Sequence, residues 1–344
     1  MAIEISLCAE GEVDEVQDFL DQYWAPGHVL ARSRVLFDWQ YRQPDGSYGM
    51  LVARSVTDAR ILGTLGFIPS TRFDPGTVGR ESVWLALWKV RDDAGAAGLG
   101  LALLSHLSRL APWRAIGALG LAEGSQALLA ALGYRTGTLS QYYFLNRTKR
   151  TFRIARVEPH PASFAVGTGG TDLVPLAPEE LDQVAAGLAP RLDTVPARTA
   201  AYFRRRFLNH PAYRYDFYGL CRNGTLSGLL TLREASAEGE RALRLVDYLG
   251  PNDGLAGAGP ALQALLESCD AEYMDVFNHG LPRESFLDAG FARLDSSGPI
   301  VVPNHFEPFS RTNSVLRFAV KMREDAPVVL FKADGDQDRP NRMA

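Results

Sequence analysis

The sequence predicts an α+β protein of two related domains, each with a mixed central sheet flanked by helices. Two glycine-rich stretches, Gly95–Gly100 and Gly254–Gly259, have the same glycine spacing. Each follows an apolar run typical of a buried strand and precedes a segment with helical periodicity. Gly133 and Gly290 end the next predicted helix at nearly the same separation from each stretch. The repeated pattern indicates an internal duplication.

The composition limits the class of protein. A chain of 344 residues can hold two domains with separate cores, and 46% hydrophobic with 22% charged residues is typical of a globular protein. A formal charge of −4 does not favour a nucleic-acid partner. The three cysteines and six histidines have no metal-ligand spacing, and the chain shows neither a leader pattern nor a membrane-spanning apolar run. We therefore expect a cytoplasmic protein with no bound metal and no membrane partner.

The first half begins with a predicted strand, Ile3–Cys8, followed by an amphipathic helix behind acidic residues. A second amphipathic segment extends from Ala31 to Tyr41. Met50–Arg54 and Ile61–Ile68 are expected to pair as a hairpin, and Val83–Val90 is the long strand that leads into the first glycine stretch.

The second half repeats this order. Leu173–Leu176 precedes apolar residues at helical spacing, and Ala197–Leu208 corresponds to the second amphipathic segment. Phe217–Cys221 and Leu226–Leu232 form the matching hairpin, because an Asn-Gly pair such as Asn223-Gly224 between apolar runs is a strong turn signal.

The segment between the halves, Asn146–Gly170, is rich in cations and ends in glycines. The cations are Arg147, Lys149, Arg150, Arg153 and Arg156. Such a cluster is either a solvated connector or an anion-binding site. We place the boundary near residue 165, which gives an N-terminal domain of residues 1–160 and a C-terminal domain of residues 165–344. At the other end of the second domain, Val328–Phe331 can dock as a strand before a polar tail.

The two glycine stretches are candidate phosphate sites. A strand that turns through small residues directly into a helix leaves backbone N–H groups pointing together at the positive end of the helix dipole. Glycine lets a ligand approach the backbone and tolerates dihedral angles that a Cβ would forbid. Such a corner can hold a phosphate or pyrophosphate, and a tight turn without a ligand is the alternative interpretation of the same glycines.

This order of elements, with a glycine stretch between the fourth strand and the third helix, resembles the GNAT superfamily of acyl-CoA-dependent N-acyltransferases. The resemblance covers nearly the whole chain as a tandem pair. The family pattern is Arg/Gln-x-x-Gly-x-Gly/Ala, and here Gly95 and Gly254 stand at its first position. The family also often has a tyrosine acid near the end of its fourth helix, where this chain has Leu129 and Phe286. Both copies therefore depart from the family at two positions.

Shorter strings narrow the resemblance. They are Trp24 with His28, Leu36–Tyr41, Ile61–Pro69, Trp88–Val90 and the tail Asp334–Pro340. They are similar to tandem GNAT enzymes that N-acylate nucleotide-linked amino sugars for bacterial surface polysaccharide, including O-antigen. The resemblance implies an acetyl-CoA or hydroxyacyl-CoA cosubstrate and a dTDP- or UDP-linked amino sugar.

Such a transfer needs a neutral amine, a polarised thioester carbonyl and a base to accept the amine proton. The candidate bases are His28, Asp247, His279 and His305. His28 precedes an amphipathic helix, so capping or packing is the alternative role. Asp247 lies within an apolar strand, where a carboxylate is either a structural anchor or a base with a shifted pKa.

The remaining candidates divide between the two ligands. The expected acyl-CoA residues belong to the first copy and are Trp88, Lys89, Val90, Gly95, Ala97, Gly98, Leu99 and Gly100. The expected acceptor residues combine cations, aromatic rings and tail side chains and are Tyr202, Arg206, His210, Lys332, Asp336, Gln337, Asp338 and Arg339. The second corner is the alternative acyl-CoA site.

Two other functions fit the same sequence. One is a GNAT acyltransferase acting on a different amine, such as an aminoglycoside, a polyamine or a peptide. The other is a non-catalytic acyl-CoA-binding module that has lost the family's basic residue and tyrosine.

Overall fold

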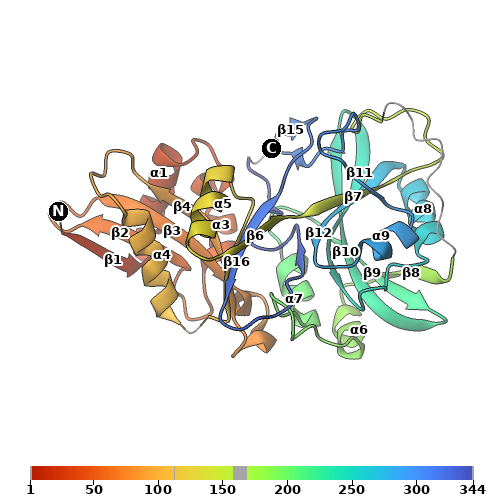
Figure 1. Cartoon of the computed structure of the whole chain (residues 1–344), viewed down its shortest axis with the longest axis horizontal. Helices are drawn as coiled ribbons and strands as arrows, with labels where there is room; N and C mark the ends of the chain where they lie inside the picture. Colours follow the sequence, from red (N-terminus) through yellow and green to blue (C-terminus); the bar gives the residue numbers. More distant parts are fainter. Residues whose placement is uncertain (1, 112, 158–168, 343–344) are drawn as a thin grey trace. The chain divides into compact units, whose positions relative to one another are not determined.

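The computed structural model describes residues 2–111, 113–157 and 169–342 (Figure 1). These residues divide into two compact units, which we call unit 1 and unit 2. Unit 1 comprises Met1–Thr136, Phe318–Asp325 and Gly335–Ala344, and unit 2 comprises Gly137–Arg317 and Ala326–Asp334. The expected domain boundary near residue 165 lies outside the described residues. The units are discontinuous in sequence, so the division into residues 1–160 and 165–344 stays a proposal about the two sequence repeats.

Unit 1 has a seven-stranded sheet in the order β1-β2-β3-β4-β5-β16-β6. Among the neighbouring strands β1-β2-β3-β4-β5-β16, only β4 and β5 run parallel to each other. The strands are β1 (Ile3–Leu7), β2 (Met50–Ser55), β3 (Ile61–Pro69), β4 (Ser82–Val90), β5 (Ala115–Leu119), β6 (Arg135–Thr138) and β16 (Arg317–Met322). The helices are η1 (Glu10–Glu12), α1 (Val13–Tyr23), α2 (Val29–Arg32), α3 (Arg34–Tyr41), η2 (Ser70–Arg72), η3 (Pro75–Thr77), α4 (Leu99–Leu110) and α5 (Glu123–Ala131).

Unit 2 has the sheet β13-β7-β12-β11-β10-β9-β8, with β17 paired to β12. Its strands are β7 (Ser140–Leu145), β8 (Thr171–Leu176), β9 (Asp216–Arg222), β10 (Thr225–Ala237), β11 (Glu240–Leu249), β12 (Ala271–His279), β13 (Ala292–Arg293) and β17 (Leu330–Phe331), with a separate pair β14 (His305–Phe306) and β15 (Phe309–Ser310). Its helices are α6 (Leu181–Gly187), α7 (Ala200–Phe203), the π-helical turn η4 (Arg204–Leu208), α8 (Gly259–Ser268) and α9 (Arg283–Asp288).

The two sheets have the same design. From the first strand outward, both contain three antiparallel pairs, one parallel pair and then an antiparallel pair. The strand next to the fifth is β16 in unit 1 and β7 in unit 2, so each sheet receives this strand from the other half of the sequence. The duplication that the glycine stretches predict is therefore present in the strand order, with one strand exchanged.

The helix predicted over Ala31–Tyr41 is two helices in the structure. His28 caps α2 by accepting the Leu30 N–H on Nδ1, and Ser33 caps α3 by accepting the Leu36 N–H. The Asn223-Gly224 hairpin is confirmed, since both residues have positive φ, as a two-residue type I′ turn requires.

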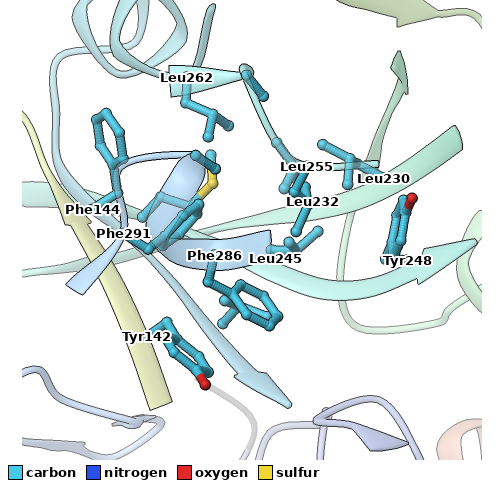
Figure 2. Close-up of a cluster of buried hydrophobic side chains, with 14 of the residues drawn as sticks. Tyr142, Phe144, Leu230, Leu232, Leu245, Tyr248, Leu255, Leu262, Phe286 and Phe291 are labelled. Carbon is cyan, nitrogen blue, oxygen red and sulfur yellow. The ribbon is translucent and has the colours of Figure 1, made fainter. Parts of the chain in front are cut away.

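The core of unit 2 lies between its sheet and the helices α8 and α9 (Figure 2). Tyr142 of β7 stacks on Phe286 of α9 with ring centroids 4.2 Å apart. Leu255 and Ala258, which belong to the second glycine stretch, are buried in the same core. The corresponding core of unit 1 lies between its sheet, α4 and α5. Within the described ranges, no helix has the length and apolar character to cross a bilayer, and no group of metal-ligating side chains is found.

Candidate functional site

The sheet of unit 1 opens between β4 and β5. Their parallel pairing ends at Leu85 and Ala118, although β4 continues to Val90. At the same point β4 carries a bulge, because Ala86–Leu87 stand opposite the single residue Gly66 of β3. A bulge removes a residue from the hydrogen-bonded ladder and bends the strand away from its neighbour. The ladder of β4 is therefore interrupted where the two parallel strands separate, and Ala86 lines the opening.

A cavity of about 580 Å³ occupies this opening, a size typical of small-molecule sites. We call it the unit 1 cavity. Its lining comes from β4, the first glycine stretch, the end of β5 with α5, and the tail. The residues are Leu85, Ala86, Trp88, Val90, Ala96, Gly98, Leu99, Gly100, Ala118, Leu119, Gly120, Leu121, Ala122, Ser125 and Leu128, with Trp24, Asp336, Gln337 and Arg339.

The first glycine stretch ends the cavity as an anion-binding corner. Gly95 and Gly98 have φ of 60° and 80°, and Gly98 is the N-cap of α4, which begins at Leu99. The first N–H groups of a helix have no partner within the helix, and the dipole adds positive potential there. Gly98, Leu99 and Gly100 line the cavity, so this end of α4 borders it directly.

The tail closes one side of the cavity. Gly335 lies against Trp84 of β4 and Leu119 of β5, and Gln337 lies directly over Gly120. Asp336 is buried, with Oδ2 accepting from Arg339 Nη2 at 2.9 Å and Oδ1 accepting from Gln337 Nε2 at 2.8 Å. It is the only carboxylate among the described residues that line the cavity.

His28 lies behind the tail as a neutral side chain. Its ring is buried, with Nδ1 accepting the Leu30 N–H and Nε2 lying 2.8 Å from Arg339 Nη1. Burial and the Arg339 charge lower the pKa of His28 to about 4. Since its proton affinity is low and its ring atoms are engaged, His28 is better suited to holding Arg339 than to accepting an amine proton.

The second glycine stretch is filled by its own chain. The Tyr248 hydroxyl donates to Pro251 O at 2.8 Å and lies where a Cβ at Gly254 would be. Pro260, at the second position of α8, has no N–H, whereas the equivalent Leu101 provides one. This corner therefore lacks both the space and one of the donors of the first.

The equivalent opening of unit 2 is also filled. The pairing of β11 with β12 ends at Leu245 and Val276, next to a bulge in β11, as in unit 1. Beyond that point β12 pairs with β17, so that Asn278 and His279 stand opposite Phe331 and Leu330. The segment containing β17 occupies the place that is open between β4 and β5.

Two buried carboxylates hold this segment through one arginine. Arg198 Nη2 donates to Asp334 Oδ1 at 2.5 Å, and Arg198 Nη1 lies 3.2 Å from Asp247 Oδ1. All three side chains are at most 2% exposed. Burial, with the second carboxylate nearby, raises the pKa of Asp247 to about 7 despite the attraction of Arg198. Asp247 is suited to anchor this segment, because its carboxylate is fully buried against Arg198 and β17 fills the opening of this sheet.

The raised pKa of Asp247 predicts a pH-dependent stability. The folded protein binds this proton more tightly than the unfolded chain, so the contribution of Asp247 to the free energy of unfolding should rise as pH falls. Between about pH 8.5 and pH 6.5 this gain is on the order of 1 kcal/mol. His28 and His305, whose pKa values are lowered, oppose it as pH falls toward their ordinary pKa of 6.5. Chemical denaturation of the wild type and of Asp247→Asn therefore measures the Asp247 contribution as the difference between the two proteins. This difference should change with pH across the range, and a difference that stays constant would contradict the assignment.

The other predicted residues divide between the two units. Side chains alternate along a strand, so Lys89 lies on the opposite face of β4 from Trp88 and Val90, which line the cavity. Lys89 pairs with Asp92. Gly95 and Ala97 shape the corner without lining the cavity. In unit 2, Arg206 donates to Ala333 O, while His210 accepts two N–H groups from the following loop. The remaining predicted residues are His279 at the end of β12, His305 in β14, and the buried Tyr202, Lys332 and Asp338. Desolvation and the charges of Lys332 and Arg244 lower the pKa of His305.

Solved structures with very different sequences have the same architecture. A GCN5-related N-acetyltransferase from Anabaena variabilis ATCC 29413 matches with a TM-score of 0.57 at 12% identity, over 93% of this chain and 73% of that chain. One from Kribbella flavida matches with a TM-score of 0.50 at 12% identity, over 93% and 71%. A conserved protein of unknown function from Enterococcus faecalis V583, described as a probable N-acyltransferase, matches with a TM-score of 0.51 at 10% identity, over 94% and 73%.

The fold is that of the GCN5-related N-acetyltransferases. At 10–12% identity the likeness establishes the GNAT fold and nothing finer. No protein-family model and no curated protein sequence matches the chain. The GNAT fold that the glycine stretches and strand order predict is confirmed.

Two features of the cavity have little signal in the local sequence. Gly120 follows a short apolar strand, and the bulge at Ala86–Leu87 lies within an uninterrupted apolar run. A glycine at position 66 opposite that run is the one local signal, since a glycine within a strand often marks a bulge.

Proposed function

We propose that the chain is an acyl-CoA-dependent N-acyltransferase that binds its cosubstrate in unit 1. The observation that carries the proposal is the combination of an open β4–β5 divergence with a donor-rich helix N-terminus at its end. In this arrangement the corner at Gly98–Leu101 holds the diphosphate, and the apolar walls around Trp88 and Leu128 hold the pantetheine and acyl chain.

The bulge in β4 supplies the electrostatic part of the reaction. When the amine nitrogen bonds to the thioester carbonyl carbon, negative charge develops on the carbonyl oxygen before the C–S bond breaks. Backbone N–H groups at Ala86–Leu87 are suited to stabilise that charge because they are fixed by the sheet before the reaction begins. The sulfur leaves as a thiolate and is protonated to give the CoA thiol.

Asp336 is suited to receive the acceptor amine. Acceptor amines reach the site as ammonium ions and must lose a proton before they attack the thioester. A carboxylate that lines the cavity attracts the ammonium and can accept its proton, and Arg339 with His28 fixes its position. The neutral, engaged His28 and the anchored Asp247 are weaker candidates for this step.

The finer form of the proposal names a dTDP- or UDP-linked amino sugar as the acceptor, with a role in surface-polysaccharide (O-antigen) synthesis and an acetyl or hydroxyacyl donor. Its support is the resemblance of the sequence strings that include Trp24 and the tail. Trp24 and three tail residues line the cavity, which is consistent with recognition of a polar acceptor next to the thioester.

Turnover assays test the acyltransferase proposal and its finer, nucleotide-linked sugar form separately. Release of CoA thiol is measured with acetyl-CoA and with longer and hydroxylated acyl-CoAs, against UDP- and dTDP-linked amino sugars, free amino sugars, aminoglycosides, polyamines and peptides. Acylation of the nucleotide-linked sugars alone supports the finer form. Acylation of another amine alone would support the acyltransferase proposal and contradict the nucleotide-linked sugar as acceptor. Binding of acyl-CoA without turnover on any amine would leave only a binding module.

We expect Asp336→Asn to lower kcat/KM for the amine about 100-fold, the scale of losing one positioned base. The affinity for acyl-CoA should change little, because the substitution keeps the side-chain size and lies away from the diphosphate corner. Asp338→Asn is the matched control, since Asp338 is buried in the same tail but does not line the cavity. Equal losses in both variants would indicate a structural role for the tail instead.

A further inference from the structure

The cationic connector of the sequence forms a second hollow, in unit 2. The segment from Arg150 to Val157, together with Glu238 and Arg311, lines a space of about 770 Å³. Four of the lining residues are arginines, Arg150, Arg153, Arg156 and Arg311, against one carboxylate, Glu238. In a chain with a formal charge of −4, this is a strong local excess of positive charge. The acyl-CoA proposal uses none of these residues.

The backbone of this arginine-rich segment is held in place by a buried carboxylate and by a hydrophobic cluster. The buried Glu272 carboxylate accepts the N–H groups of Arg153, Ile154 and Ala155, the last two at 3.0–3.1 Å. Ile154, Ala155 and the nearby Val157 are buried in a hydrophobic cluster of unit 2. Glu272 thus fixes the segment through its backbone and leaves the arginine side chains unneutralised.

Two further contacts complete this support. Arg156 exchanges backbone hydrogen bonds with Val301 at 2.9 and 2.8 Å. Arg311 donates from Nε to Ile154 O at 3.3 Å and from Nη2 to Arg153 O, so the fourth cation is tied to the same segment. These contacts therefore fix the backbone of Arg153 and Arg156 and the guanidinium group of Arg311.

The charges that remain are available. Among the described residues, the guanidinium groups of Arg150 and Arg156 have no ion-pair or hydrogen-bond partner, and Arg153 approaches Glu240 only at 3.9 Å. Glu240 is itself engaged at 2.9 Å by Lys149. Arginine presents several donors in a planar fork that matches phosphate oxygens.

We propose that this hollow is a binding site for a small phosphorylated ligand with a diphosphate or a similarly dense anionic group. The volume falls in the range of small-molecule sites, which favours a compact ligand over a polymer. Phe152, which also packs against the hydrophobic cluster, adds apolar surface to the same lining, so a nucleoside diphosphate fits better than inorganic phosphate. The site is independent of the acyl-CoA proposal.

The test is calorimetric titration of the full chain with inorganic pyrophosphate and with UDP, dTDP and ADP, first without and then with CoA. CoA itself carries a nucleoside diphosphate, so the heat that depends on Arg150 and Arg156 is the signal of the arginine site. We expect one site whose affinity falls with added salt. The double variant Arg150→Gln/Arg156→Gln should weaken pyrophosphate by about tenfold for each guanidinium removed, while leaving CoA affinity unchanged. Arg205→Gln, an exposed arginine elsewhere in unit 2, is the control and should change neither.

Each outcome separates the two proposals. Pyrophosphate binding that is equal in the wild type and the double variant, or absent from both, overturns the arginine site whatever CoA does. Tighter binding of a single-stranded oligonucleotide than of any nucleoside diphosphate also overturns it. If CoA fails to bind, pyrophosphate binding that depends on Arg150 and Arg156 still supports this site while the acyl-CoA proposal fails.

Discussion

Gly98→Asp should reduce the affinity for acyl-CoA by about 100-fold, whereas Gly98→Asn should leave it close to that of the wild type. Gly98 has φ of 80° and open space around the position of a Cβ. Asn and Asp have the same shape, and both tolerate this backbone region better than other side chains. Only Asp places a negative charge beside the diphosphate, at a cost of about 2.7 kcal/mol for this change in affinity. Equilibrium titration with CoA measures the difference.

The second glycine stretch provides the control for this experiment. Gly257 has φ of 77° at the equivalent position, so Gly257→Asp introduces the same charge and the same backbone strain. We expect its effect on CoA affinity to be small, because that corner is filled by Tyr248 and lacks the donor that Pro260 removes. A loss of affinity in Gly257→Asp with none in Gly98→Asp would move the acyl-CoA site to unit 2.

Arg198→Met should destabilise the protein by about 3–5 kcal/mol, the cost of leaving a buried charge without its partner. The variant keeps most of the side-chain volume, but Asp247 and Asp334 then face each other without the cation that lies between them. The loss should be larger at about pH 8 than at about pH 6, because Asp247 is more easily protonated at the lower pH. Denaturant unfolding at both values gives the two free energies.

A compensated variant tests the stated cause. Arg198→Met/Asp247→Asn/Asp334→Asn removes both carboxylate charges with the arginine and should recover most of the lost stability. If the triple variant is as unstable as the single one, the packing of Arg198 against Tyr202 and Phe331 is responsible instead of its charge. Both variants should keep their affinity for CoA, since all three residues belong to unit 2.

The exchange of β7 and β16 between the two sheets could not be predicted from the local sequence. Both strands are apolar runs at the right place in each repeat, and nothing local in β7 or β16 records which sheet they join. The choice depends on pairing with β12 or β5, which are far away in sequence. For the same reason, the linear division at residues 160–165 and the compact units differ in extent.

The tail shows the same limit at the level of single residues. Its mixed charges are typical of a solvated segment, yet Asp334, Asp336 and Asp338 are buried. Burial is favourable for Asp334 because Arg198 supplies a partner from a distant part of unit 2, and for Asp336 because Arg339 of the same tail pairs with it and contacts His28. Asp336 was expected to bind substrate from the density of polar groups around it, and the structure adds that it lines the same cavity as the glycine corner.

The α+β class, the duplication and the first glycine corner could be predicted from local rules: apolar periodicity, the need for glycine at positive φ, and the turn preference of Asn-Gly. The tertiary structure decided which of two similar corners stays open. Tyr248, Pro260 and β17 fill the space in unit 2, while the tail leaves a cavity in unit 1. That difference follows from packing between segments distant in sequence, which no local pattern encodes.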